Sequence, residues 1–205
     1  MKKISIYCFI LISLGFIGCT SKTHEKTIED FDIREMSLQV DTLYSRMTQA
    51  ERVAQLYGIR PKEIMEDGKL SLEKCKEKIS DGIGHICQYA CALDMEPNEL
   101  RDFVRDLQNY LIHETPSGIP AIFHEEAITG LAAKGATVYP QQLGIACTWN
   151  PELATVKTEQ TAEVMRSVGA TLALSPMVDL IRTAHWPRIE ESYGEDGCWP
   201  CSPWW

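Results

Sequence analysis

Charged side chains follow two apolar runs of the sequence and are the first candidates for a binding site. The tripeptide His124–Glu126 follows the run 119–123, and Arg182 comes after the run 171–174. Carboxylate and guanidinium groups held in fixed geometry make strong, directional hydrogen bonds. Each residue also has an alternative role without ligand binding. Glu126 could be a solvated loop carboxylate, and Arg182 could form a structural ion pair with Asp179 or Glu190.

Cysteines form a second possible site. Cys198-x-x-Cys201 has the spacing of half a zinc site, but no second ligand pair of matching spacing exists. We therefore expect neither a metal nor another cofactor. Four further cysteines could pair in an oxidising compartment, although a chain of this length needs no disulfides to build a core; these are Cys75, Cys87, Cys91 and Cys147.

The N-terminal sequence predicts export. Lys2 and Lys3 precede the largely apolar stretch 4–17, which is typical of a secretory signal and too short to span a bilayer. The following Phe16-Ile17-Gly18-Cys19 resembles a bacterial lipobox. We predict a signal peptide at 1–18, a lipid anchor at Cys19 and a polar tether at 19–37, placing the protein at the bacterial cell envelope, in the periplasm or at the outer membrane. A plain secretory signal with an incidental cysteine is the alternative.

The charge of the chain excludes one class of partner. The 205 residues contain 20 Lys+Arg and 29 Asp+Glu, for a net charge of −9. An acidic chain has no electrostatic footprint for nucleic acid, so no nucleic-acid partner is expected.

Apolar runs alternate with helical patterns along the chain. The runs 82–86, 119–123 and 171–174 predict buried strands. Helices are predicted from Leu38 onward, over 72–79 and after Pro97. A capping box at Thr48 and Glu51 predicts the start of another helix, which carries Val53, Leu56 and Tyr57 on one face. A further helix is predicted from an Asn150 cap to Gly169, and its apolar positions are Leu153, Val156, Val164, Met165 and Val168. Strands separated by helices favour an α/β fold with a parallel sheet, in which ligands bind beyond the carboxyl ends of the strands.

Three groups of motifs, in this order, resemble one known family. They are MTQAERVAQL at 47–56; GIPAIFHEEAITG at 118–130 with TVYPQ at 137–141 and TWNPEL at 148–153; and SP at 175–176, DLIR at 179–182 and WPRIEESYGED at 186–196. Together they look like the N-terminal barrel of glycoside hydrolase family 3, the β-glucosidase and β-xylosidase type. The resemblance covers about 38–196 and implies roughly the first three strands of a (β/α)₈ barrel. The tail 197–205 departs from the family pattern.

The resemblance also implies an activity. Family members are retaining O-glycosyl hydrolases in carbohydrate metabolism, and their substrate would be an oligosaccharide or another β-glycoside. Glu126 matches the acid, and Arg182 the arginine, that bind sugar hydroxyls, with His124 and Glu125 as supports. The family's nucleophile and acid/base lie farther along the barrel, so no catalytic residue is assigned here and the chain alone is expected to be inactive. The alternative function is that of a non-catalytic, sugar-binding surface lipoprotein.

Two further expectations concern side chains near this site. Trp149 is expected in the core, because it lies at a helix cap; the alternative is a platform on which a sugar ring stacks. Arg188 is expected in a charge network that orders its loop, together with the acidic residues Glu190, Glu191, Glu195 and Asp196.

Overall fold

The computed structural model describes residues 33–197. The predicted signal peptide, Cys19, most of the tether and the tail after 197 lie outside these residues. The chain divides into two compact units, Met1–Thr42 and Leu43–Trp205. Helix α1 (Ile33–Arg46) begins before the predicted helical pattern at Leu38, so the last part of the proposed tether is helical. No helix in the described part of the chain has both the length and the apolar character needed to cross a membrane.

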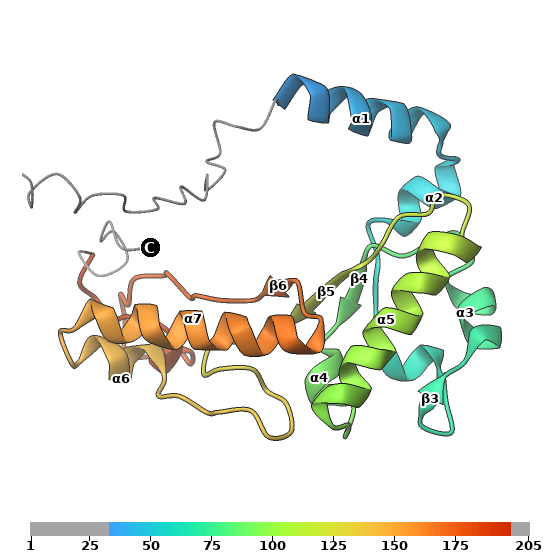
Figure 1. Ribbon diagram of the computed structural model, residues 1–205. Coiled ribbons are helices and arrows are strands. Elements are labelled where there is room, and N and C mark those ends of the chain that lie inside the picture. Colours follow the sequence, from blue (N-terminus) through green and yellow to red (C-terminus); the bar gives the residue numbers. More distant parts are fainter. Residues whose placement is uncertain (1–32, 198–205) are drawn as a thin grey trace, which may run out of the picture. The chain divides into compact units, whose positions relative to one another are not determined.

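A four-stranded parallel sheet forms the centre of the second unit (Figure 1). Its strands lie in the order β1 (Gly58–Ile59), β4 (His85–Cys87), β5 (Ile122–Glu125) and β6 (Leu172–Ala173). Every neighbouring pair is parallel. The α/β class with a parallel sheet is thus confirmed. The sequence analysis missed β1, because two residues are too few to produce an alternating pattern.

Helices and short turns connect these strands. A small antiparallel hairpin, β2 (Met65–Glu66) with β3 (Lys69–Leu70), follows the first strand. The helices are α2 (Gln49–Ala54), α3 (Leu72–Lys78), α4 (Tyr89–Ala92), α5 (Pro97–Glu114), α6 (Gln142–Ala146) and α7 (Pro151–Val168), with 3₁₀ turns η2 (Pro61–Ile64) and η3 (Ile189–Glu191).

The predicted helix boundaries are confirmed where a cap specifies them. Thr48 and Glu51 form a reciprocal capping box at the start of α2. The side chain of Asn150 caps α7 by accepting a hydrogen bond from the backbone of Glu152. Gly169 ends α7 with φ +90°, a left-handed conformation that glycine adopts without steric cost.

Two predicted strands begin later than expected because their first residues are engaged elsewhere. Gly84 packs so closely on the end of α2 that a Cβ would lie 2.0 Å from the carbonyl oxygen of Gln55. The backbone of Ala121 pairs with the side chain of Gln108 on α5, through hydrogen bonds of 2.8 and 3.0 Å. The N–H of Gly84 donates to the carbonyls of Ala54 and Tyr57, and only its carbonyl accepts from the neighbouring strand, from Ile122 at 2.9 Å, so the strands start at His85 and Ile122.

The two faces of the sheet differ in burial. Ile86 and Phe123 are paired in register and fully buried, and Leu107 of α5 is equally buried in the same apolar cluster. Burying one such side chain contributes about 1.5–3 kcal/mol. Residues that alternate with these in the strands point the other way, and Ile122 and Leu172 remain 41% and 38% exposed.

Some apolar residues of the predicted helix faces are exposed. Helix α2 ends at Ala54, so Leu56 and Tyr57 lie in the turn that leads to β1 and are 83% and 62% exposed. Helix α7 buries Met165 and Val168 of its predicted apolar positions, whereas Leu153 and Val156 are exposed. Its other buried residues are Ala154, Lys157 and Thr161.

Trp149 is 73% exposed, which contradicts the predicted core position. Its φ of +53° belongs to the tight turn between α6 and α7.

Candidate functional site

Glu126 lies at the carboxyl edge of the sheet, directly after β5, and is held from the neighbouring strand. Gln88 directly follows β4, and its Nε2 donates a hydrogen bond of 3.1 Å to Oε1 of Glu126. The backbone N–H of Gln88 donates to the carbonyl of His124 at 2.9 Å. Gln88 has φ +51°, a left-handed conformation that turns the chain from β4 into α4. The half-buried Glu126 carboxylate therefore has one oriented donor from the protein and can still accept further hydrogen bonds.

Glu125 points to the opposite side of β5 and is completely buried. Its Oε1 accepts a hydrogen bond of 2.7 Å from the backbone N–H of Ala90 in α4. Its Oε2 has no partner among residues 33–197. Burial raises the pKa of Glu125 to about 7, although the N–H groups of Ala90 and Tyr89 act in the opposite direction. Glu125 thus joins β5 to the first turn of α4, beside Gln88.

His124 shares the open face of the sheet with His85. The two Nδ1 atoms are 3.3 Å apart, so one nitrogen must donate and the other accept. Burial and the neighbouring His85 lower the pKa of His124, while the charge of Glu126 raises it. The lowered pKa favours the neutral ring, which can share a single proton across this contact.

The structure does not join Arg182 to Glu126. Arg182 is exposed, and within residues 33–197 it makes no hydrogen bond or ion pair, neither with Glu126 nor with Asp179 or Glu190. The structural ion pair considered for Arg182 is therefore not formed in the described part of the chain. Its assignment to sugar binding stays a prediction.

The charge of Glu126 affects the pKa of a different arginine, Arg188. Its guanidinium group pairs with Glu191 within the loop, as expected for part of the charge network. The hydrogen bond to Glu191 raises the pKa of Arg188, and the charges of Glu126 and Asp179 act in the same direction. The sequence analysis placed Arg188 in the loop network only. Both arginines follow β6, so the path of the chain after that strand sets how far each one lies from Glu126.

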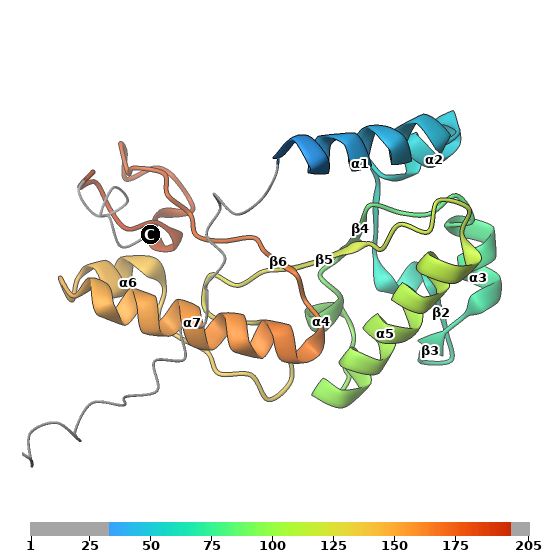
Figure 2. The same ribbon diagram turned by 45° about the horizontal axis from the view of Figure 1, so that its top comes forward.

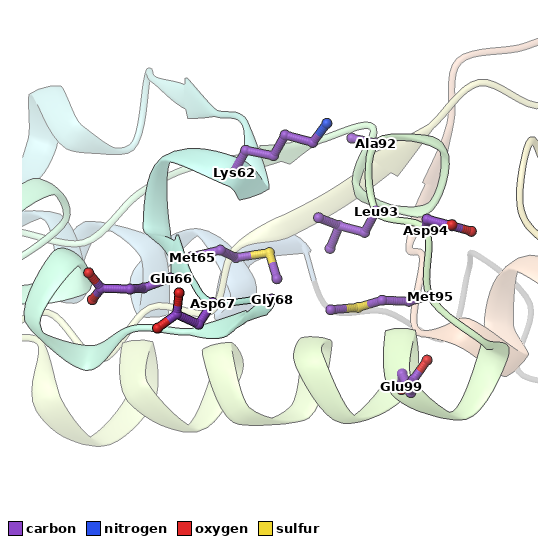
Figure 3. A pocket seen from close by; sticks show the side chains of 10 residues that line it. All are labelled: Lys62, Met65, Glu66, Asp67, Gly68, Ala92, Leu93, Asp94, Met95 and Glu99. Carbon is purple, nitrogen blue, oxygen red and sulfur yellow. The ribbon is translucent and has the colours of Figure 1, made fainter.

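An open pocket of about 510 Å³ lies away from this edge site. Figure 3 shows Met65, Leu93 and Met95 gathered in it. Charged side chains surround these apolar residues; they are Lys62, Glu66, Asp67, Asp94 and Glu99. Glu126 does not line this pocket.

No group of three potential ligands in the described segment could hold a metal ion. The four cysteines of that segment are free thiols, namely Cys75, Cys87, Cys91 and Cys147. Cys198 and Cys201, the half zinc site of the sequence analysis, lie outside it.

A parallel sheet with helices on one face and polar side chains at its carboxyl edge defines part of a (β/α) barrel that binds ligands at that edge. The model of the glycosyl hydrolase family 3 N-terminal domain matches residues 48–199. The chain therefore belongs to glycosyl hydrolase family 3, and the fold predicted from its motifs, part of a (β/α)₈ barrel, is confirmed.

Relatives and solved structures agree with this assignment. A protein of Formosa agariphila named as a β-xylosidase is 31% identical over 202 residues, covering 96% of this chain and 26% of its own length. The β-glucosidase of Erythrobacter marinus superposes with a TM-score of 0.67 and 31% identity, over 77% of this chain and 20% of that one. The β-glucosidase of Listeria innocua, solved in complex with isofagomine, gives a TM-score of 0.59 and 26% identity, over 80% and 21%. The chain thus spans about a fifth to a quarter of the length of these proteins.

Proposed function

We propose that this chain contributes part of the sugar-binding subsite of a family 3 β-glycosidase, of the β-glucosidase or β-xylosidase type, with Glu126 as its central acceptor. The observation that carries this proposal is the position of Glu126 at the carboxyl edge, with its carboxylate oriented by Gln88. An oriented carboxylate can accept hydrogen bonds from two neighbouring hydroxyl groups of a pyranose.

An arginine donor would complete the subsite. Arg182 is the arginine that the sequence motifs select, and Arg188 is the one whose charge interacts with that of Glu126. The two assignments differ in their test. If Arg188 binds the sugar, Arg188→Gln weakens binding while Arg182→Gln does not, and the reverse holds for Arg182.

The bond-breaking step is assigned to carboxylates outside this chain. Retaining glycosidases need a nucleophile and an acid/base about 5–5.5 Å apart. We infer that the 205-residue chain binds the sugar ring without cleaving the glycosidic bond.

The test combines binding and turnover. Isofagomine, glucose and xylose are titrated into the 205-residue chain by ligand-observed NMR, with Glu126→Gln as the test variant. Exposed Glu114 at the end of α5 provides the matched control, Glu114→Gln. We expect Glu126→Gln to weaken binding by at least about tenfold, because a charge-assisted hydrogen bond contributes about 1.5–3 kcal/mol.

Three outcomes would decide the matter. Equal binding by both variants would remove Glu126 from the subsite. Cleavage of an aryl β-glucoside or β-xyloside by this chain would show that it contains the catalytic carboxylates. Specific sugar binding, together with a downstream reading frame that lacks the rest of the barrel, would favour the alternative of a non-catalytic sugar-binding lipoprotein.

We further propose export to the bacterial cell envelope with a lipid on Cys19. The support is the sequence of the first residues, since these lie outside the described part of the structure. Metabolic labelling with a radioactive fatty acid should mark the wild-type chain and leave Cys19→Ala unlabelled. Equal labelling, or none in the wild type, would contradict the anchor.

A further inference from the structure

A buried lysine near the carboxyl edge of the sheet has no charged partner among the described residues. Lys157 of α7 is 7% exposed. Its Nζ donates to the carbonyl of Pro140 at 3.0 Å and lies 3.5 Å from Oε1 of Gln142. Both acceptors are neutral, and no carboxylate among residues 33–197 forms an ion pair with this ammonium group. Burying a charge without a counter-charge is costly, and burial lowers the pKa of Lys157.

The same lysine lines a small cavity. The cavity has a volume of about 130 Å³ and lies between α7 and the ends of β5 and β6. Figure 2 shows α6 and α7 alongside the segment that follows β6. Polar lining is supplied by the side chains of Lys157, Gln142, Thr158, Thr161, Ser175 and Tyr193.

Part of the cavity wall is apolar, which narrows the class of ligand. Ala127, Ala162 and Met165 line it together with Ala173 and Pro176. Since one water occupies about 30 Å³ of liquid, the volume corresponds to roughly four waters. A ligand of about four to six non-hydrogen atoms, with an anionic end and a short aliphatic end, matches this size and lining.

We propose that this cavity binds a short-chain monocarboxylate, of the size of acetate, whose carboxylate pairs with the ammonium group of Lys157. The anion supplies the counter-charge that the protein does not, and its methyl group contacts the alanine and methionine wall. Chloride could meet the charge alone, but it would leave this wall unfilled. The site is separate from Glu126, so it stands independently of the proposed sugar binding.

The test compares acetate with its neutral isostere. Thermal unfolding of the 205-residue chain is measured at pH 7 in 100 mM sodium acetate, 100 mM sodium chloride, and 100 mM acetamide with 100 mM sodium chloride. A ligand present at several times its dissociation constant stabilises the folded state by about 1 kcal/mol, so acetate should raise Tm by roughly 2–4 °C above the other two. An equal Tm in all three solutions would refute the proposal.

Variants locate the effect. Lys157→Met removes the ammonium group and should abolish the acetate shift. Lys134→Met removes an exposed lysine, paired with Glu96 at 2.7 Å, and should retain the shift. A shift that survives in Lys157→Met would place acetate elsewhere. If Lys157→Met does not fold, line broadening of ¹³C-acetate by the wild-type chain, absent for ¹³C-acetamide, decides the matter, and equal broadening of both overturns the proposal.

Discussion

Glu125 should make the stability of the fold depend on pH. Its pKa is about 7 in the folded chain against an ordinary value of 4.5, because its carboxylate is buried with one oxygen unpartnered in the described structure. The folded state therefore binds this proton more tightly than the unfolded state does. This group's contribution to stability is complete below about pH 4.5 and is lost as the pH rises through 7. A difference of about 2.5 pKa units corresponds to roughly 3 kcal/mol.

The perturbation that isolates this effect is Glu125→Gln. Glutamine resembles the protonated acid, because it keeps the acceptor for the Ala90 N–H and places an N–H donor where the protonated carboxyl places its O–H. The two proteins should therefore differ in stability by no more than about 1 kcal/mol at pH 5. At pH 8 the variant should be the more stable protein, because the wild type then carries a buried charge.

Urea denaturation at pH 5 and pH 8 measures this difference. Other groups titrate in the same range, so the relevant quantity is the unfolding free energy of the wild type minus that of the variant. We expect it to change by roughly 2.5 kcal/mol between the two pH values, because a small part of the effect is already lost at pH 5. Glu114→Gln, at an exposed position, should show no such change. Parallel pH profiles for the wild type and Glu125→Gln would show that the carboxyl group is not protonated in the folded state near neutral pH.

Two further predictions concern a backbone turn and the histidine pair. Gly169→Ala should lower the unfolding free energy by at least about 1–2 kcal/mol, because φ is +90° and the new Cβ would lie 2.8 Å from a methyl carbon of Val104. Thermal unfolding measures this loss, and an unchanged Tm would contradict the predicted strain. His85→Ala should raise the pKa of His124, since the charge of His85 is one of the two causes that lower it. The chemical shift of the His124 C2 proton, followed against pH by NMR, measures this pKa. The same titration curve in the variant and the wild type would exclude the interaction.

The proposed sugar-binding residue and the residue that makes stability pH-dependent are neighbours at the end of β5. Glu126 faces the carboxyl edge and receives the hydrogen bond from Gln88, whereas Glu125 points into the helix layer and anchors α4. Ionising Glu125 would weaken the packing beneath the turn that carries Gln88. Sugar binding by the wild type should then decrease above pH 7 more than binding by Glu125→Gln. An identical pH dependence of binding in the two proteins would show that α4 does not transmit the charge.

The sequence by itself determined the features that depend on local interactions. The capping groups of Thr48 and Asn150 act within one helical turn, so they specified the starts of α2 and α7. Apolar runs between helices predicted parallel strands, and the three groups of motifs, taken together and in order, identified the family. A residue at the end of a parallel strand reaches the carboxyl edge whatever the details of packing, so the position of Glu126 was predictable as well.

Tertiary structure decided whatever depends on segments distant in the sequence. Strand β1 exists because Gly58 and Ile59 pair with β4, although two residues carry no pattern of their own. The effect of the Glu126 charge on the pKa of Arg188 depends on the path of the chain after β6. Lys157 is buried, and its ammonium group contacts Pro140 and Gln142, which precede α7 in the sequence. The helical periodicity of α7 does not indicate this burial. Propensity and capping act over a few residues, whereas burial, pairing and pKa depend on neighbours that only the folded chain brings together.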